Sequence, residues 1–135
     1  MSGRSGLRIA GAVLCFAVGV VPVASAQNKT GETVYREVCS TCHATGVAGA
    51  PKFGDKAVWK PLIEEGQPVL TAHAWVGVRA MPAQGGRADL TLAEFARAAA
   101  HMARAAGGNW KDPDAKMLAA IAEEEKKRRA DPNRK

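Results

Sequence analysis

The sequence is short of cysteine, of aromatic side chains and of long apolar runs. It contains three cysteines, three tryptophans, three phenylalanines and one tyrosine among 135 residues. So few aromatic rings cannot build a base-stacking platform, and the formal charge of +6 is spread along the chain, so we expect no nucleic-acid partner. No strand pattern or internal repeat is visible. The longest apolar run, residues 9–23, has about fifteen residues, fewer than the roughly twenty that a membrane-spanning helix needs.

The apolar run fits an export signal. Arg4 and Arg8 precede it, and Ala24 to Ala26 follow it as a small-residue cleavage site. Cleavage after Ala26 would remove Cys15 and leave 135 − 26 = 109 residues, with a charge of 6 − 2 = +4. That length is typical of one domain. We therefore expect residues 1–26 to be a signal peptide that directs the protein to the periplasm, with an uncleaved membrane anchor as the alternative.

The strongest motif is Cys39 to His43, which reads CSTCH. C-x-x-C-H is the attachment signature of c-type haem, in which both thiols form thioethers and the imidazole ligates iron. A thioredoxin-like disulfide would need a βαβ pattern, which the sequence lacks. A zinc site would need further ligands at suitable spacing, and only His73 and His101 remain. The motif predicts one covalent haem c held by Cys39, Cys42 and His43.

Met81 is the candidate for the second axial ligand of the iron. It lies in a predicted loop, 81 − 43 = 38 residues after His43, and Pro82 stiffens the chain beyond it. A thioether in this position gives an electron-transfer centre with a raised reduction potential. His73 and His101 are rivals, and ligation by two histidines would lower the potential while still allowing electron transfer. With both axial positions filled, the iron has no site for a substrate, so we expect an electron carrier and not an enzyme.

Apolar spacing and capping residues predict helices and no strand. The clearest signal is the capping box of Thr91 and Glu94. Glutamates 123–125 precede basic residues 127–129 at i, i+4, a favourable order in a helix. Helices are expected at about residues 30–41, 55–65, 69–78 and 91–106, with a fifth from Asp112-Pro113 to Asp131-Pro132. Residues 109–135 would form a charged extension that packs loosely on a domain over residues 27–108, with a docking arm as the alternative.

With these motifs the chain resembles the class I c-type cytochromes, and within them it is most similar to the short bacterial branch called cytochrome c-five. The resemblance covers about residues 30–104. It implies an all-α fold of four helices around one covalently bound haem, followed here by the C-terminal helical extension. The matching segments are Cys39–His43, Gly49–Asp55, Trp59, Met81–Gly86 and Leu92–Met102.

The resemblance also implies roles for single residues. Cys39 and Cys42 bind the haem, His43 is the proximal ligand and Met81 the distal one. The Pro51 carbonyl accepts the His43 Nδ1 proton, and Trp59 lies beside the haem near a propionate.

The resemblance also predicts how the first and fourth helices cross, and the chain departs from the family at two places. Gly31 and Tyr35 on the first helix are expected to cross the region of Phe95 and His101 on the fourth, where the glycine permits a close approach. The branch often has a second cysteine pair after its Gly-Gly, but Arg87 and Leu90 occupy those positions. His101 replaces the family's aromatic residue before the methionine of the last helix.

The function that we expect is single-electron transport by an exported monohaem cytochrome acting as a monomer. Its donor would be a quinol-oxidising complex or a dehydrogenase, and its acceptor a terminal oxidase or reductase of a respiratory chain. It would meet the membrane only through these partners. One alternative is a haem c subunit of a periplasmic oxidoreductase complex, and another is a gas-binding haem protein with an open sixth position.

Overall fold

The computed structural model describes Gly3 and residues 28–133. The expected signal peptide over residues 1–26 therefore lies, apart from Gly3, outside the described residues. Within residues 28–133 no helix has the length and hydropathy that a membrane crossing requires. The β pairing in this part of the chain amounts to one isolated bridge between Val78 and Met81. The expectation of an all-α fold is confirmed.

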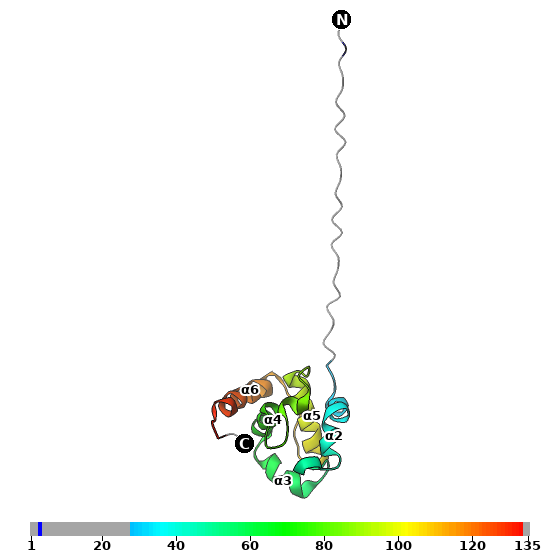
Figure 1. Cartoon of the computed structure of the whole chain (residues 1–135), viewed down its shortest axis with the longest axis vertical. Coiled ribbons are helices and arrows are strands. Elements are labelled where there is room, and N and C mark those ends of the chain that lie inside the picture. The colour runs from blue at the N-terminus through cyan, green and yellow to red at the C-terminus, as the bar shows by residue number, and fades with distance from the viewer. Residues whose placement is uncertain (1–2, 4–27, 134–135) are drawn as a thin grey trace.

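The helices follow the expected order, and their ends agree with the expectation to within a few residues. The first helix runs without a break from Gly31 to His43 but consists of three segments. The middle segment is a π turn, in which Ser40 N donates to Tyr35 O, and an α-helical segment lies on each side of it. The elements are α1 (Gly31–Val34), η1 (Tyr35–Cys39), α2 (Ser40–His43), η2 (Val47–Gly49), α3 (Lys56–Glu64), α4 (Gln67–Val76), η3 (Ala83–Gly86), α5 (Leu92–Ala105) and α6 (Ala115–Ala130). Figure 1 shows α4 and α5 in the middle of the molecule, between α6 and α2.

The first helix crosses α5 at Gly31. A Cβ placed on Gly31 would lie 2.6 Å from the carbonyl carbon of Arg97, closer still to its oxygen, and 3.1 Å from the His101 Cβ. Only glycine allows the two backbones to approach this closely. The expected crossing near His101 is therefore confirmed, and Tyr35 meets the His101 ring at a centroid distance of 5.7 Å.

Alanines form much of the buried face of α5. Ala96, Ala100 and Ala103 have no exposed surface, and Ala98 is 1% exposed. Ala96 packs with Ala72 of α4, while Ala100 and Ala103 pack against Trp110. The small side chains let several elements come close to the same helix.

The extension packs more tightly than expected. Ile121 of α6 is fully buried against Ala72 and Ala96, and Met117 and Leu118 add to this contact. The prevalence of charged residues favours loose packing, but one buried isoleucine with two half-buried neighbours is enough to form an interface. The ion pairs differ in part as well: Glu125 pairs with Arg129 at the predicted i, i+4 spacing, whereas two glutamates reach lysines at i, i+3, namely Glu123–Lys126 and Glu124–Lys127.

The predicted capping box at the start of α5 is present and also holds the N-terminal segment. Glu94 N donates to Thr91 Oγ1 at 3.2 Å, and the Glu94 carboxylate accepts from Thr91 N at 3.0 Å. The same carboxylate accepts from Lys29 N at 3.2 Å. The hydrogen bond from the Thr91 backbone N–H is the main reason why the pKa of Glu94 is lowered. Ionised Glu94 therefore stabilises the folded state above its ordinary pKa, and this contribution is lost as the pH falls through the lowered value.

We expect Glu94→Gln to lower the free energy of unfolding at pH 7 by about 1 kcal/mol, because the amide accepts these bonds less strongly than a carboxylate. The difference from the parent protein should shrink below about pH 3, where Glu94 itself is protonated. Urea unfolding at the two pH values measures it, with Glu123→Gln on the exposed face of α6 as the control. An equal loss at both pH values would show that the charge of Glu94 is not the cause.

Candidate functional site

His43 ends α2 and is held on two sides by the loop that follows it. Its Nδ1 lies 2.8 Å from the Pro51 carbonyl oxygen, and its own carbonyl accepts from Phe53 N at 2.7 Å. A carbonyl oxygen only accepts hydrogen bonds, so Nδ1 must carry the ring proton. In the neutral ring Nε2 then keeps its lone pair, and neutral imidazole is the form of histidine that binds a metal. The ring is 7% exposed, so its orientation is fixed by packing as well as by the bond to Pro51.

Cys39 and Cys42 lie one helical turn apart beside His43, and neither is in a disulfide. Both side chains are half-buried. Burial raises the pKa of the Cys39 thiol to about 11. A redox-active C-x-x-C motif needs a thiol whose pKa is lowered, so the environment of Cys39 is opposite to the one that the thioredoxin-like alternative requires.

Cys39 lies between two apolar clusters, which we call the methionine cluster and the tryptophan cluster. The methionine cluster contains Val34, Val38, Trp75, Leu90, Phe95 and Ala98, with Met81 packed against it. The tryptophan cluster contains Trp59, Met102 and Ala106, with Tyr35, Phe53, Leu62, Ile63 and Leu70 packed against it. Cys39 contacts both, so the chain surrounds the attachment motif with apolar side chains on two sides.

Met81 is fixed through its backbone to the residues that end α4. Val78 N donates to Met81 O at 3.1 Å, and Met81 N donates to Val78 O at 2.9 Å. Gly77 has φ +97°, and a Cβ there would lie 3.2 Å from Met81 O and 3.0 Å from Ala83 N. Arg79 forms the tip of the turn at φ +53°, an uncommon conformation for a residue with a side chain. The sequence indicates Met81 as a candidate, but the supporting roles of Gly77 and Val78 were not predicted, although a glycine directly after a helix is a turn signal.

Arg87 and Leu90, which stand where the family branch has cysteines, have structural roles of their own. Arg87 makes two hydrogen bonds of 2.8 Å to the Asp89 carboxylate. This guanidinium lowers the pKa of Asp89 to about 2. Leu90 is 6% exposed and belongs to the methionine cluster.

Trp59 lies in the tryptophan cluster and is 4% exposed. Its Nε1–H donates to the Lys52 carbonyl oxygen at 2.9 Å, so the indole N–H is satisfied within the protein. This bond joins α3 to the same loop that carries Pro51. Trp59 thus supports the wall beside Cys39, and its proximity to a propionate stays a prediction.

The two rival histidines each have partners of their own. His73 Nδ1 lies 3.4 Å from the Glu65 carboxylate. His101 lies beside the rings of Tyr35 and Phe53, at centroid distances of 5.7 and 5.5 Å. Those two rings stack on each other at 4.3 Å. Met81, by contrast, has a thioether that packs in an apolar cluster next to the motif.

The donor set fits a haem better than a bare metal ion. Among residues 28–133 no three His, Cys, Asp or Glu side chains gather as a metal-binding group, which argues against the zinc alternative. Two free thiols and an Nε2 lone pair from one helix end are what covalent haem attachment and axial ligation require. A nearby thioether adds a soft ligand that suits haem iron.

The chain is similar to several known proteins. A family profile described as "Cytochrome C oxidase, cbb3-type, subunit III" matches residues 26–102. Cytochrome c-555 of Chlorobaculum tepidum is 45% identical over 76 residues, which are 53% of this chain and 70% of that protein. Cytochrome c5 of Azotobacter vinelandii is 37% identical over 76 residues, and the match covers 55% of this chain and 92% of that protein.

A solved structure is similar as well. It is described as "Crystal structure of electron transfer complex of nitrite reductase with cytochrome c", and the matched chain is 46% identical with a TM-score of 0.55. The match covers 56% of this chain and 93% of that one. The family profile ends at residue 102, so α6 lies beyond the segment that it matches.

Proposed function

Because this chain belongs to the class I monohaem c-type cytochromes, we propose that Cys39 and Cys42 carry its haem while His43 and Met81 ligate the iron. Members of this family bind one covalent haem c and carry electrons, and the chain is accordingly an electron carrier and not an enzyme. The expectations about family, fold, cofactor and electron transport are thereby confirmed. The assignment of each ligand is our own step.

The observation that carries the ligand set is the hydrogen bond from His43 Nδ1 to the Pro51 carbonyl. It fixes the tautomer and leaves Nε2 with its lone pair, next to two thiols that are not joined to each other. A donor bond of this kind also raises the basicity of the ligating nitrogen. The distal assignment is supported by the backbone pairing of Met81 with Val78, which fixes the position from which the thioether projects.

When bound, the haem supplies a centre that gains and loses one electron. The protein holds this centre, tunes it and shields it from water. His43 contributes an imidazole of fixed orientation, Met81 a neutral sulfur that favours the reduced iron, and the two apolar clusters a surrounding of low dielectric.

The experiment is the mass and optical spectrum of the chain produced in cells that mature c-type cytochromes. We expect a coloured protein that begins at Gln27 and carries the mass of one haem. A double Cys39→Ser, Cys42→Ser variant should lose the covalent mass. A colourless parent protein of bare polypeptide mass would overturn the ligand set, and a product that retains residues 1–26 would overturn the cleavage site alone.

We further propose that the protein works in the periplasm as a freely diffusing shuttle between respiratory partners. The donor is a quinol-oxidising complex or a dehydrogenase, and the acceptor a terminal oxidase or reductase. The similar cytochrome c chain, which was solved in an electron transfer complex with nitrite reductase, supports an acceptor of the reductase class. The shuttle is favoured over a permanent subunit because α6 packs against α4 and does not project as a docking arm. Size-exclusion chromatography of protein purified from its native source should give a monomer, whereas elution with a stable partner would favour the subunit.

A further inference from the structure

Helix α4 connects the C-terminal extension to the Met81 turn. On one side, Ala72 packs against Ile121, which is the one fully buried residue of α6. Helix α6 packs mainly on α4 and to a smaller extent on α5. Figure 1 shows α6 lying beside α4. The extension therefore supports one side of this helix.

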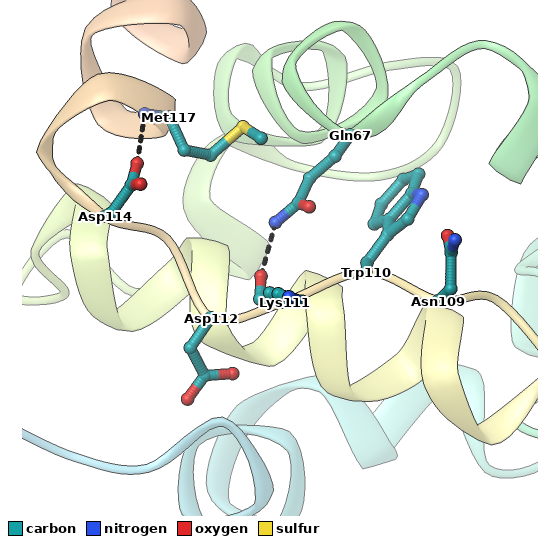
Figure 2. A pocket seen from close by; sticks show the side chains of 7 residues that line it. All are labelled: Gln67, Asn109, Trp110, Lys111, Asp112, Asp114 and Met117. Carbon is teal, nitrogen blue, oxygen red and sulfur yellow. Dashed lines mark hydrogen bonds between the residues drawn. The ribbon is translucent and has the colours of Figure 1, made fainter.

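The extension is also attached to the first turn of α4. Gln67 Nε2 donates to the Lys111 carbonyl oxygen at 2.7 Å, and Gln67 is 7% exposed. Figure 2 shows this bond among the residues that line a pocket between α4 and the linker that precedes α6. Arg104 of α5 holds the same linker, since it donates to the Trp110 carbonyl at 3.1 Å and pairs with Asp112 at 3.1 Å. The extension thus contacts α4 at two separated points.

On its other side α4 supports the candidate distal ligand. Trp75 near the C-terminal end of α4 belongs to the methionine cluster against which Met81 packs. Gly77, the first residue after α4, lies in close contact with the Met81 carbonyl, and Val78 pairs with Met81 through two backbone hydrogen bonds. Any tilt of α4 would therefore displace Met81.

The proximal histidine is held mainly by another part of the chain, although Leu70 of α4 packs against the same cluster as Phe53. His43 is oriented by Pro51 and Phe53, which belong to the loop after α2 and not to α4. Weakening the contact between α6 and α4 should consequently loosen one side of the site more than the other.

We propose that α6 acts as a brace on α4 that keeps Met81 in place, with Ile121 as the positioning residue. The proposal rests on the ligation by Met81 proposed above, and it gives a role to a segment that lies outside the matched family profile. An open sixth position would admit small ligands and lower the reduction potential, so the brace protects the electron-transfer function.

Hydrogen exchange of the haem-loaded, full-length protein tests the brace. In Ile121→Ala, the Met81 amide, which is bonded to Val78 O, should exchange at least about tenfold faster relative to the Phe53 amide, which is bonded to His43 O. Ile121→Val should restore most of the protection, since it removes a single methylene group. Thr91→Ala, which weakens the cap of α5 without touching α4 or α6, should change both amides by a similar factor. Equal acceleration of both amides in Ile121→Ala would overturn the proposal.

Imidazole binding to the oxidised protein gives a second readout. Imidazole competes only when Met81 has left the iron, so its apparent affinity should rise in Ile121→Ala by about the factor by which the open fraction rises. An unchanged affinity would overturn the brace as a device that holds the ligand. If the parent protein shows no sulfur-to-iron band, Met81 is not the ligand, and α6 has no ligand to hold in place. The ratio of the two exchange rates would still decide whether α6 stabilises the Met81 turn.

Discussion

Replacing Met81 with alanine should abolish the sulfur-to-iron absorption band of the oxidised protein and lower its reduction potential by on the order of a hundred millivolts, within the roughly 0.8 V that axial ligands control. The neutral thioether stabilises reduced iron, and alanine has no donor to replace it. Water or a second histidine would then occupy the position, and either one favours oxidised iron. Optical spectroscopy and potentiometric titration measure the two effects.

Met117→Leu is the matched control for this change. Met117 lies on α6, half-buried against the cluster that contains Ile121, so the swap conserves volume and removes a thioether at a distance from the motif. Its band and potential should be those of the parent protein. If Met81→Ala kept the band, another residue would be the ligand. Loss of low-spin character in His73→Ala or His101→Ala would then identify which of the two rivals binds.

Gly31→Ala should destabilise the protein by at least about 2 kcal/mol, because its Cβ would overlap the Arg97 carbonyl group of α5. Helix propensity alone would predict the opposite sign, a gain of about 1 kcal/mol for replacing glycine with alanine in a helix. The steric overlap outweighs the gain in helix propensity because the obstructing atoms belong to the backbone, which cannot rotate away as a flexible side chain can. Thermal or urea unfolding of the haem-loaded protein measures the loss.

Glu32→Ala is the control within the same helix. Glu32 is exposed and its nearest basic partner, Arg36, is 4.0 Å away, so the change should stay within about 0.5 kcal/mol. A Gly31→Ala protein as stable as its parent would mean that the first helix and α5 separate without penalty. The crossing would then have no part in fixing the site.

The helix starts could be predicted because their signals are local. Thr30, Asp55 and Thr91 each accept hydrogen bonds from backbone N–H groups two or three residues ahead, and the sequence shows such caps directly. The core of the proposed site can be predicted for a related reason. Covalent attachment and proximal ligation by neighbouring residues require a fixed spacing, which the run from Cys39 to His43 displays.

The remaining features depend on contacts between distant segments. The π turn over Tyr35–Cys39 adds one residue to a helix whose apolar pattern is regular in the sequence, and no residue type marks it. The burial of Ile121 depends on Ala72 and Ala96, which are 49 and 25 residues away in the chain. The bond from the Trp59 indole to the Lys52 carbonyl follows from how the loop folds back on α3, and no spacing rule predicts such a bond.

The alanines at the buried positions of α5 limit how this protein can evolve. Any substitution of an alanine introduces either glycine or a larger side chain, and Ala96, Ala98, Ala100 and Ala103 have at most 1% of their surface free to accommodate one. Glycine would weaken the helix by about 1 kcal/mol, and a larger residue would force apart the elements that meet there. Selection would remove nearly all variants at these four positions, so lineages descending from this sequence should diverge on the exposed face of α6 long before they diverge inside α5.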